Sequence, residues 1–511
     1  MIHLTALLRR STLHRLSGIQ RKPFGLFVEA RSFHCDSMSQ FLGQLQTQLK
    51  AVAATRTDAG DHSTLIHSLA RQFKSHYISL STATVTSTLH EGRSAILDFM
   101  ASHLGPWDED VQSQMNKYQE TTGMPRYHAM QSTRDALTPG YERLLRIILE
   151  ENAKEGMTFM ITLREDLLLH IRTLQQPQQQ QQQSQQDESL ARLKQLDTHL
   201  RQVLTTWFSP EMLQIRRITY EGTSAALIEQ IATKEAVHPI QSLDDLKSRL
   251  GSDRRVFAAF HPLLPEQPLV FVHVALRTNI PTSMKEVLEP IHVHPIKVAA
   301  FYSISSTQPG LSGIDLGHVL LKKAKALLKE EFPTLETTVT LSPIPRFRKW
   351  LQAKLSTLIH GGTFMDDTLL CADDRTLLSR CFHDHDNVVA HFLSQLEDPH
   401  ELMTAHGVDL EPLLMKLAAS YLLHQKHRRK PLDGVARFHI HNGAELYQLN
   451  YMADSSRKGL HNSLGIMVNY RYDRDTVAEN QAKYQSNYSI PVAEGVSRWL
   501  PDLVADTRSE S

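Results

Sequence analysis

Seven consecutive residues read Val298-Ala299-Ala300-Phe301-Tyr302-Ser303-Ile304, an apolar run whose β-branched and aromatic side chains are typical of a buried strand. A glycine-containing loop follows, Pro309-Gly310-Leu311-Ser312-Gly313-Ile314-Asp315-Leu316-Gly317. Apolar residues then recur at helical spacing up to Phe332-Pro333: Val319, Leu320, Leu321, Ala324, Leu327 and Leu328. Glycine lets the backbone approach a ligand closely, and the free N–H groups of a helix start suit a phosphate. The order strand, glycine loop, helix therefore predicts a phosphate-binding loop.

Further short strands surround this unit. The pattern predicts strands at Val256–Phe260, Leu269–Leu276 and Thr338–Leu341, and the last of them leads into Ser342-Pro343-Ile344-Pro345. Strands alternating with helices indicate an α/β arrangement from residue 209 onward.

Three segments carry a resemblance to known families. The loop Ser312–Gly317, followed by Val319-Leu320-Leu321, is similar to the pyrophosphate loop of the acetyl-CoA-dependent N-acetyltransferase superfamily, although Asp315 stands where those enzymes usually have a small residue. Together with the loop, three strings resemble the malonyl-CoA decarboxylase family: Phe301-Tyr302-Ser303-Ile304-Ser305, Leu341-Ser342-Pro343-Ile344-Pro345 and Phe438-His439-Ile440-His441-Asn442-Gly443-Ala444. This likeness covers most of residues 205–475.

The resemblance implies an α+β fold, with an all-helical N-terminal domain at residues 37–208 and an acetyltransferase-like mixed α/β catalytic domain at residues 209–511. It implies conversion of malonyl-CoA to acetyl-CoA and CO2 in fatty acid metabolism, without a metal or an organic cofactor. It also implies a homo-oligomer, a dimer or a tetramer, with contacts supplied by the helical domain.

The N-terminal half independently reads as helical. Leu163, Leu167, Ile171 and Leu174 lie on one helical face, and Leu190, Leu193, Leu196, Leu200, Val203 and Trp207 lie on another. A glutamine tract, Gln175 to Gln186, separates them. Because such a tract cannot bury apolar surface, we expect a solvated loop between two helices.

Composition limits the possible partners. The 511 residues are 41% hydrophobic, and 55 Lys and Arg balance 55 Asp and Glu. A neutral chain argues against a broad nucleic-acid surface, and no apolar run reaches the roughly 18 residues of a membrane span. Three cysteines are too few for a disulfide framework. Cys371, Cys381, His383 and His385 could form a zinc set, but their spacing favours ordinary helix residues.

The first 35 residues differ from the rest. They are rich in arginine and serine, contain Glu29 as the only Glu among them, and place Leu4, Leu7, Leu8 and Leu16 on one helical face. This composition predicts a mitochondrial transit peptide over residues 1–36 and a location in the matrix; the alternative is a basic tail without a targeting role. Met38 could start a shorter cytosolic form. The ending Arg508-Ser509-Glu510-Ser511 is not a peroxisomal signal.

The segment from Gly434 to Met452 contains the strongest catalytic candidate. Ala436, Phe438 and Ile440 alternate with Arg437, His439 and His441, which predicts a strand with three polar side chains on one face. Asn442-Gly443 then suits a tight hairpin. The resemblance implies that His439 is the proton donor, with His441 a weaker candidate.

The resemblance assigns the remaining site residues. Ser342 would hydrogen-bond the malonyl carboxylate or act in the proton chain, Asp315 would orient His439, and Tyr472 would join the active site. Tyr472 lies in a predicted strand, Ile466–Tyr472, beside Tyr470. CoA would be held by Ser312, Gly313, Ile314, Asp315, Leu316, Gly317 and His318. By contrast, His238 before Pro239 is expected to be a structural turn residue.

His439 suits acid–base work because the free pKa of histidine, roughly 6.5, lies close to working pH. Two other functions remain open: an acyl-CoA N-acetyltransferase, which would need an amine pocket and a base, and a non-catalytic CoA-binding protein. The presence of Ser342, His439 and Tyr472 together disfavours the latter.

Overall fold

The fold is described from a computed structural model. It describes residues 61–80, 86–106, 108–176, 183–291, 295–360 and 369–500, together with residues 43, 44 and 47. The predicted transit peptide and the C-terminal tetrapeptide lie outside these residues. The chain forms two compact units, residues 1–199 and 200–511, and the division falls within one helix. The predicted domain boundaries at 36/37 and 208/209 stay predictions.

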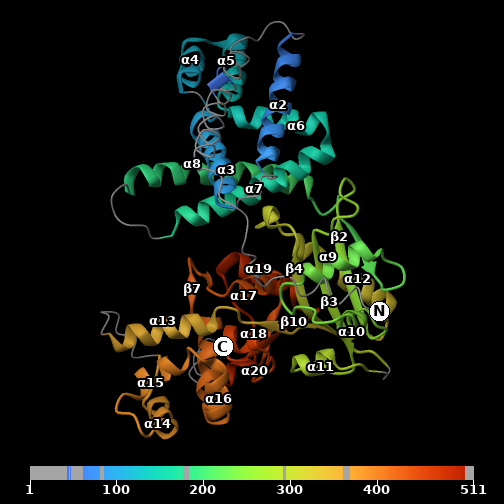
Figure 1. The fold of residues 1–511 in the computed structure, drawn as a ribbon, viewed down its shortest axis with the longest axis vertical. Coiled ribbons are helices and arrows are strands. Elements are labelled where there is room, and N and C mark those ends of the chain that lie inside the picture. The colour runs from blue at the N-terminus through green and yellow to red at the C-terminus, as the bar shows by residue number, and fades with distance from the viewer. Residues whose placement is uncertain are drawn as a thin grey trace, which may run out of the picture. The chain divides into compact units, whose positions relative to one another are not determined.

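The first unit is helical, as expected (Figure 1). Helix α6 packs on α7 and on α2, and α3 also packs on α7. The aromatic rings of Phe73, Tyr77 and Phe159 meet in this core, where the Tyr77 and Phe159 ring centroids lie 5.4 Å apart. The helices are α2 (Asp61–Ser79), α3 (Thr86–His103), α4 (Asp108–Glu120), α5 (Gly123–Ala136), α6 (Gly140–Glu151), α7 (Ala153–Leu174) and α8 (Gln183–Trp207).

The glutamine tract is shorter as a loop than predicted. Helix α7 ends at Leu174, but α8 already begins at Gln183, so Gln183–Gln186 are helical. Glutamine has a good helix propensity, and a helix with an apolar stripe further along can extend into such residues. The expectation of a loop was therefore wrong for the last four residues, while residues 177–182 lie outside the described part.

The second unit is built on a nine-stranded sheet in the order β1-β2-β3-β4-β5-β10-β9-β11, with β6 paired to β10. Strands β4 and β5 run parallel, while their outer neighbours β3 and β10 pair with them in antiparallel fashion. The strands are β1 (Gln214–Ile218), β2 (Arg254–Phe260), β3 (Val270–Arg277), β4 (Val298–Ser306), β5 (Thr337–Thr340), β6 (Ser342–Pro343), β9 (Glu445–Asn450), β10 (Met467–Tyr472) and β11 (Val492–Ala493). Five of the six strands predicted from sequence in this unit are confirmed, namely those that match β2, β3, β4, β5 and β10.

The parallel pair β4 and β5 is joined by the loop and helix predicted from sequence. A 3₁₀ turn (Pro309–Leu311) leads into α12 (Leu316–Glu331), which packs against β2, β3 and β4 (Figure 1). Its buried residues include Leu320, Leu321, Ala324 and Leu328, the stripe expected from spacing. In sheets of this kind, ligands bind at the carboxyl ends of parallel strands, where the phosphate loop and Ser342 both lie.

The other elements of this unit include a helical cluster, in which α13, α15, α16 and α18 pack together. They are α9 (Ala225–Lys234), α10 (Leu243–Arg249), α11 (Met284–Leu288), α13 (Phe347–Ile359), α14 (Ala372–Cys381), α15 (Val388–Gln395), α16 (Pro399–His424), β7 (Lys426–His427), β8 (Lys430–Pro431), α17 (Gly434–His441), α18 (Arg457–Ser463), α19 (Val477–Asn487) and α20 (Glu494–Ser497). Among the described residues, no helix combines the length and apolar character that a bilayer span requires.

The strand predicted around His439 was wrong, because this segment is the helix α17. Asp433 caps its start by accepting hydrogen bonds from the N–H groups of Val435 (2.9 Å) and Ala436 (2.8 Å). Its end is a Schellman cap: Gly443, at φ +81°, donates to the Ile440 carbonyl, and Ala444 donates to the His439 carbonyl. Asn442-Gly443 is thus a helix end, not a hairpin.

The helical period also changes which side chains face inward. Ala436, His439 and Ile440 are buried, at the i, i+3, i+4 spacing of one helical face, whereas Arg437 and His441 are exposed. A segment of eight residues fits both the period of two of a strand and the period of 3.6 of a helix. The Asp433 cap at its start and the Schellman cap at its end favour the helix.

Candidate active site

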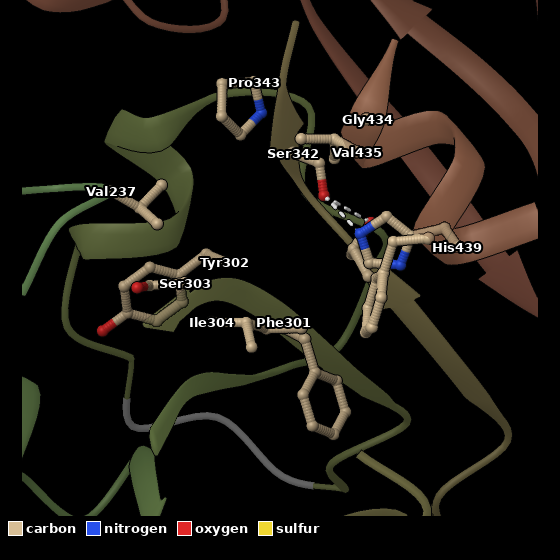
Figure 2. Close-up of a pocket in the computed structure, with 12 residues that line it drawn as sticks. Val237, Phe301, Tyr302, Ser303, Ile304, Ser342, Pro343, Gly434, Val435 and His439 are labelled. Atoms are coloured by element: carbon tan, nitrogen blue, oxygen red, sulfur yellow. Dashed lines mark hydrogen bonds between the residues drawn. The ribbon is translucent and has the colours of Figure 1, made fainter. Parts of the chain in front are cut away.

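The candidate active site is a cavity of about 260 Å³ at the carboxyl ends of β4 and β5 (Figure 2). β4 contributes its wall from Phe301 to Ile304, and Thr340 and Ser342 follow from the end of β5. Phe438 and His439 approach from α17. Tertiary folding therefore brings residues of all three strings of the sequence resemblance to one cavity.

A row of hydrogen bonds crosses this site. His439 Nδ1 lies 2.8 Å from Tyr472 Oη, and its Nε2 lies 3.2 Å from Ser342 Oγ. Ser342 Oγ in turn donates to Thr340 Oγ1 at 2.9 Å. Because the Ser342 proton is directed to Thr340, its lone pairs face His439, which places the imidazole proton on Nε2. Nδ1 is then the acceptor of the Tyr472 hydroxyl proton.

The imidazole is held by packing as well as by hydrogen bonds. Tyr470 stacks on it, with ring centroids 4.5 Å apart, and Tyr470 and Tyr472 come from the same face of β10. A bulge in the pairing of β10 with β9 falls between Asn469 and Tyr470. His439 is 3% exposed, so its ring has little freedom.

Burial lowers the pKa of His439 to about 3. The imidazole is therefore neutral near pH 7, and the expectation of a donor that titrates close to working pH was wrong for the free protein. A charged imidazolium would lose its hydration in this cavity without a carboxylate in contact to replace it. Burial, followed by the charge of Asp315, raises the pKa of Tyr472, so this phenol keeps its proton.

Asp315 does not orient His439 as expected. It is exposed at the start of α12, and the described hydrogen bonds of the imidazole go to Tyr472 and Ser342. The charge of Asp315 raises the pKa of Tyr472, and it is Tyr472 that contacts His439.

A second cavity, of about 510 Å³, contains the predicted phosphate loop. Gly313, Ile314, Asp315 and Gly317 line it, but Ser312, Leu316 and His318 are not among its lining residues. Leu316 is instead buried in the core under α12. Gly313 has φ +78°, a conformation that side chains rarely adopt, and its N–H and neighbouring backbone form the turn.

Two cationic side chains also line this second cavity. They are Lys430 and Arg437, with His441 in the same lining, and none of the three was expected to bind the phosphates. Gly434 and Phe438 line both cavities, so α17 forms a shared wall between the phosphate loop and His439. Both cavities therefore lie along this helix.

Sequence reasoning missed several functional neighbours. Lys325 lies on α12 with Nζ 4.2 Å from the centroid of the Tyr472 ring, and burial followed by the charge of Lys322 lowers its pKa to about 8. Lys325 lies in the third turn of α12, and only its position on one face of the helix could have indicated a contact with Tyr472. Thr340 was read as an ordinary strand residue, because nothing in the strand pattern marks its hydroxyl as the partner of Ser342 Oγ.

The zinc alternative finds no support in the geometry. Cys371 lies beside Lys416, with Sγ 3.3 Å from Nζ, and the ring of His385 stacks on that of His391 at 3.5 Å. Among the residues that the structure describes, no three His, Cys, Asp or Glu side chains are placed to hold a metal ion.

Comparison with known proteins agrees with the sequence resemblance. Residues 211–510 match the malonyl-CoA decarboxylase C-terminal domain, and residues 104–208 match the malonyl-CoA decarboxylase N-terminal domain. The chain is 34% identical to the mitochondrial malonyl-CoA decarboxylase of Rattus norvegicus, over 74% of each protein. It is 32% identical to that of Anser anser anser, over 73% of this chain and 71% of the goose protein.

Solved structures give the same result. The crystal structure of malonyl-CoA decarboxylase from Rhodopseudomonas palustris is similar with a TM-score of 0.68 and 29% identity, over 89% of this chain and 99% of that one. The Agrobacterium vitis structure gives 0.68 and 27% over the same shares. By domain matches, curated relatives and solved structures alike, the chain belongs to the malonyl-CoA decarboxylase family.

Proposed function

We propose that this chain converts malonyl-CoA to acetyl-CoA and CO2, with the hydrogen-bonded row Tyr472, His439 and Ser342 as its catalytic centre. The observation that carries this proposal is the position of that row. It opens on a small cavity whose wall continues into a second cavity that contains a phosphate-type loop.

The reaction needs few protein groups. As CO2 leaves, the thioester carbonyl accepts the electron pair and an enolate forms, which must then be protonated on carbon. The protein has to hold CoA, orient the carboxylate and supply the proton. A buried cavity with few polar groups suits this task, because it limits access of bulk water to the enolate.

Ser342 and His439 act on neighbouring atoms of the malonyl group. When malonyl-CoA binds, the Ser342 hydroxyl turns from Thr340 and donates its proton to the carboxylate, while His439 Nε2–H donates to the carbon from which CO2 departs. The 3.2 Å between Oγ and Nε2 lets both reach the same short acyl segment. His439 acts as a neutral acid, since burial keeps its pKa at about 3. An enolate carbon is a strong enough base to take such a proton.

Tyr472 and Lys325 offset the charge that His439 gains. As Nε2 loses its proton, negative charge develops on the imidazole, and the Tyr472 hydroxyl donates to Nδ1 from 2.8 Å. A proton from water then returns to Nε2, so one solvent proton is consumed for each CO2 released. Hydrogen bonds to a charged partner are roughly twice as strong as neutral ones. The Lys325 ammonium above the Tyr472 ring adds a positive charge on the outer side.

CoA binds in the second cavity. The backbone around Gly313 and Gly317 faces the pyrophosphate, and the predicted set Ser312, Gly313, Ile314, Asp315, Leu316, Gly317 and His318 remains the binding segment. Lys430 and Arg437, which line the same cavity, supply positive charge for the phosphates; the sequence had not indicated them as ligands.

The test is to incubate the purified protein with malonyl-CoA alone, without an amine acceptor or added metal. Equal amounts of CO2 and acetyl-CoA support the decarboxylase. If acetyl-CoA is instead consumed only when an amine is added, the chain is an acyltransferase. If CoA binds and nothing is converted, the chain is a non-catalytic CoA-binding protein.

The location and assembly are part of the same proposal. We infer that residues 1–36 direct the protein to the mitochondrial matrix; the curated relatives from goose and rat are named as mitochondrial proteins. We also infer a homo-oligomer, a dimer or a tetramer, formed through the helical unit. Mass measurement in solution by light scattering tests the assembly.

A further inference from the structure

The turn at residues 235–239 is held against the sheet by a buried carboxylate. Glu235 accepts hydrogen bonds from Ser303 Oγ at 2.7 and 2.8 Å, and from the N–H groups of Val237 (2.8 Å) and His238 (2.9 Å). His273 Nε2 lies 3.3 Å from the same carboxylate. Strands β3 and β4 supply His273 and Ser303, so one side chain ties the turn to two strands.

The hydrogen bonds of this turn keep the Glu235 carboxylate charged although it is buried. Burial by itself would raise the pKa of Glu235, but His273, the His238 N–H and Ser303 together lower it to about 2. A buried charge is stable only where several hydrogen bonds replace its lost hydration. Removing any of them is costly, so the turn has one well-defined position.

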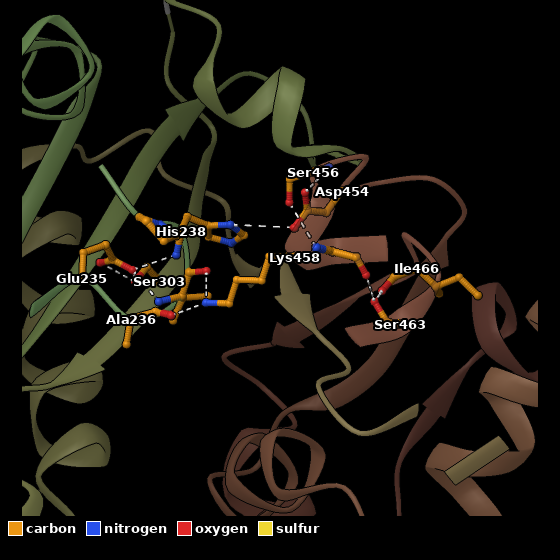
Figure 3. A network of polar contacts seen from close by, with 12 residues as sticks. Glu235, Ala236, His238, Ser303, Asp454, Ser456, Lys458, Ser463 and Ile466 are labelled. Atoms are coloured by element: carbon orange, nitrogen blue, oxygen red, sulfur yellow. Dashed lines mark hydrogen bonds and ion pairs between the residues drawn. The ribbon is translucent and has the colours of Figure 1, made fainter. Parts of the chain in front are cut away.

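A lysine on helix α18 holds the same turn (Figure 3). Lys458 on α18 donates to the Ala236 carbonyl and, at 2.9 Å, to the Val237 carbonyl. His238 Nδ1 lies 3.9 Å from Asp454 Oδ2, just before α18. The turn is therefore fixed from two directions, although it is on the surface of this unit.

Both attachments fix the position of Val237. Its N–H is bound to Glu235 and its carbonyl to Lys458, while its side chain lines the acyl cavity. Figure 2 shows Val237 on the side of the cavity opposite Ser342 and His439. With both backbone groups bound, the backbone of Val237 cannot move away from an incoming acyl group without breaking a hydrogen bond.

We propose that Val237 is the residue that limits the size of the acyl group, and that Lys458 is the positioning residue that keeps it in place. The cavity of about 260 Å³ then takes malonyl and disfavours a malonyl group with a 2-alkyl branch. This inference rests on the proposed function, because it assigns the specificity of the same site.

The first experiment changes the volume of residue 237. We expect Val237→Ala to raise kcat/KM for 2-methylmalonyl-CoA relative to malonyl-CoA by about tenfold, the usual effect of one carbon in a hydrophobic pocket. Val237→Leu should lower the same ratio. Val408→Ala is the matched control, because Val408 is 86% exposed on α16. Thermal melts establish that each variant is folded.

The second experiment tests the positioning role. Lys458→Met keeps the aliphatic stem but removes the donor, and should raise the same ratio; Lys458→Arg should restore it. Lys426→Met, at an exposed lysine of β7, is the control. A merely stabilising role for Lys458 would lower the melting temperature and leave the ratio unchanged, which would overturn the positioning role.

A third measurement separates this inference from the proposed function. Affinities for acetyl-CoA and propionyl-CoA, obtained by calorimetry, need no catalysis, and Val237→Ala should favour propionyl-CoA relative to the wild type. If the wild type releases no CO2, the proposed function fails and the affinity ratio alone decides the role of Val237. Wild-type selectivity in folded Val237→Ala and Val237→Leu would overturn the inference, as would an equal shift in Val408→Ala.

Discussion

Tyr472→Phe removes one atom from the proposed catalytic row. The ring remains in place, so the stacking around His439 and the contact with Lys325 are kept. What is lost is the hydroxyl 2.8 Å from His439 Nδ1. Both residues are almost fully buried, so water cannot easily replace the missing partner.

The expected loss follows from the strength of that bond. A hydrogen bond to a charged group contributes about 1.5–3 kcal/mol, and the imidazole gains negative charge in the transition state. Since about 1.4 kcal/mol corresponds to a tenfold change in rate, kcat should fall by about 10- to 150-fold. The affinity for acetyl-CoA should change little, because the neutral ground state depends less on this bond.

Tyr470→Phe is the matched control. The Tyr470 ring stacks on the same imidazole, but its hydroxyl is buried without a hydrogen-bond partner among the described residues. Loss of this hydroxyl breaks no hydrogen bond, so we expect the activation free energy to change by no more than roughly 0.5 kcal/mol and kcat by less than about threefold. The assay is steady-state release of CO2 and acetyl-CoA from malonyl-CoA, with melts for each variant.

Two results would refute this reasoning. A folded Tyr472→Phe with the kcat of the wild type would mean that Nδ1 needs no donor. Equal losses in Tyr472→Phe and Tyr470→Phe would mean that the effect comes from packing and not from the hydrogen bond.

The remaining predictions concern the reaction, the ligand and the location. Ser342→Ala should lower kcat but leave acetyl-CoA affinity near normal, whereas His439→Asn should lower turnover by roughly 10²–10⁴ with a smaller effect on binding; near-normal turnover in His439→Asn would remove it from the chemistry. The pH–rate profile should fall above about pH 8, where Lys325 loses its charge, and Lys325→Arg should move that fall to higher pH; an unmoved profile counts against Lys325. Gly313→Val should weaken CoA binding in calorimetry, because its side chain blocks close approach of the phosphates; the strain of a valine at φ +78° should also lower the melting temperature, so the melt must first show that the variant is folded. Unchanged affinity in the folded variant would place the phosphates elsewhere. A reporter fused to residues 1–40 should enter mitochondria, and a diffuse cytosolic signal would contradict the presequence.

The sequence was sufficient for the parts of the fold that depend on local pattern. The run Val298–Ile304 is largely apolar because β4 is buried on both faces, and the spacing of Leu320, Ala324 and Leu328 indicates the buried side of α12. These signals are repeated over many residues, so one period clearly fits better than the other. The phosphate-type loop and the position of Ser342 after β5 follow from the order of those elements.

Segment 434–441 shows where local pattern is insufficient. Eight residues fit both a period of two and a period of 3.6, and the choice depends on Asp433 at one end and on the Schellman cap at Gly443 at the other. The resemblance indicated His439, but the sequence pattern placed it on a strand instead of a helix and therefore predicted the wrong neighbouring side chains.

The properties of the site depended on tertiary structure alone. Thirty-three residues separate His439 from Tyr472, and 97 separate it from Ser342, so no spacing rule could predict their hydrogen bonds. The pKa of His439 is lowered because the surrounding sheet and helix exclude water, which is a property of packing and not of the residue. Burial and long-range contacts are decided only when the chain is folded, and they determine whether a histidine named by the sequence acts as a charged or a neutral acid.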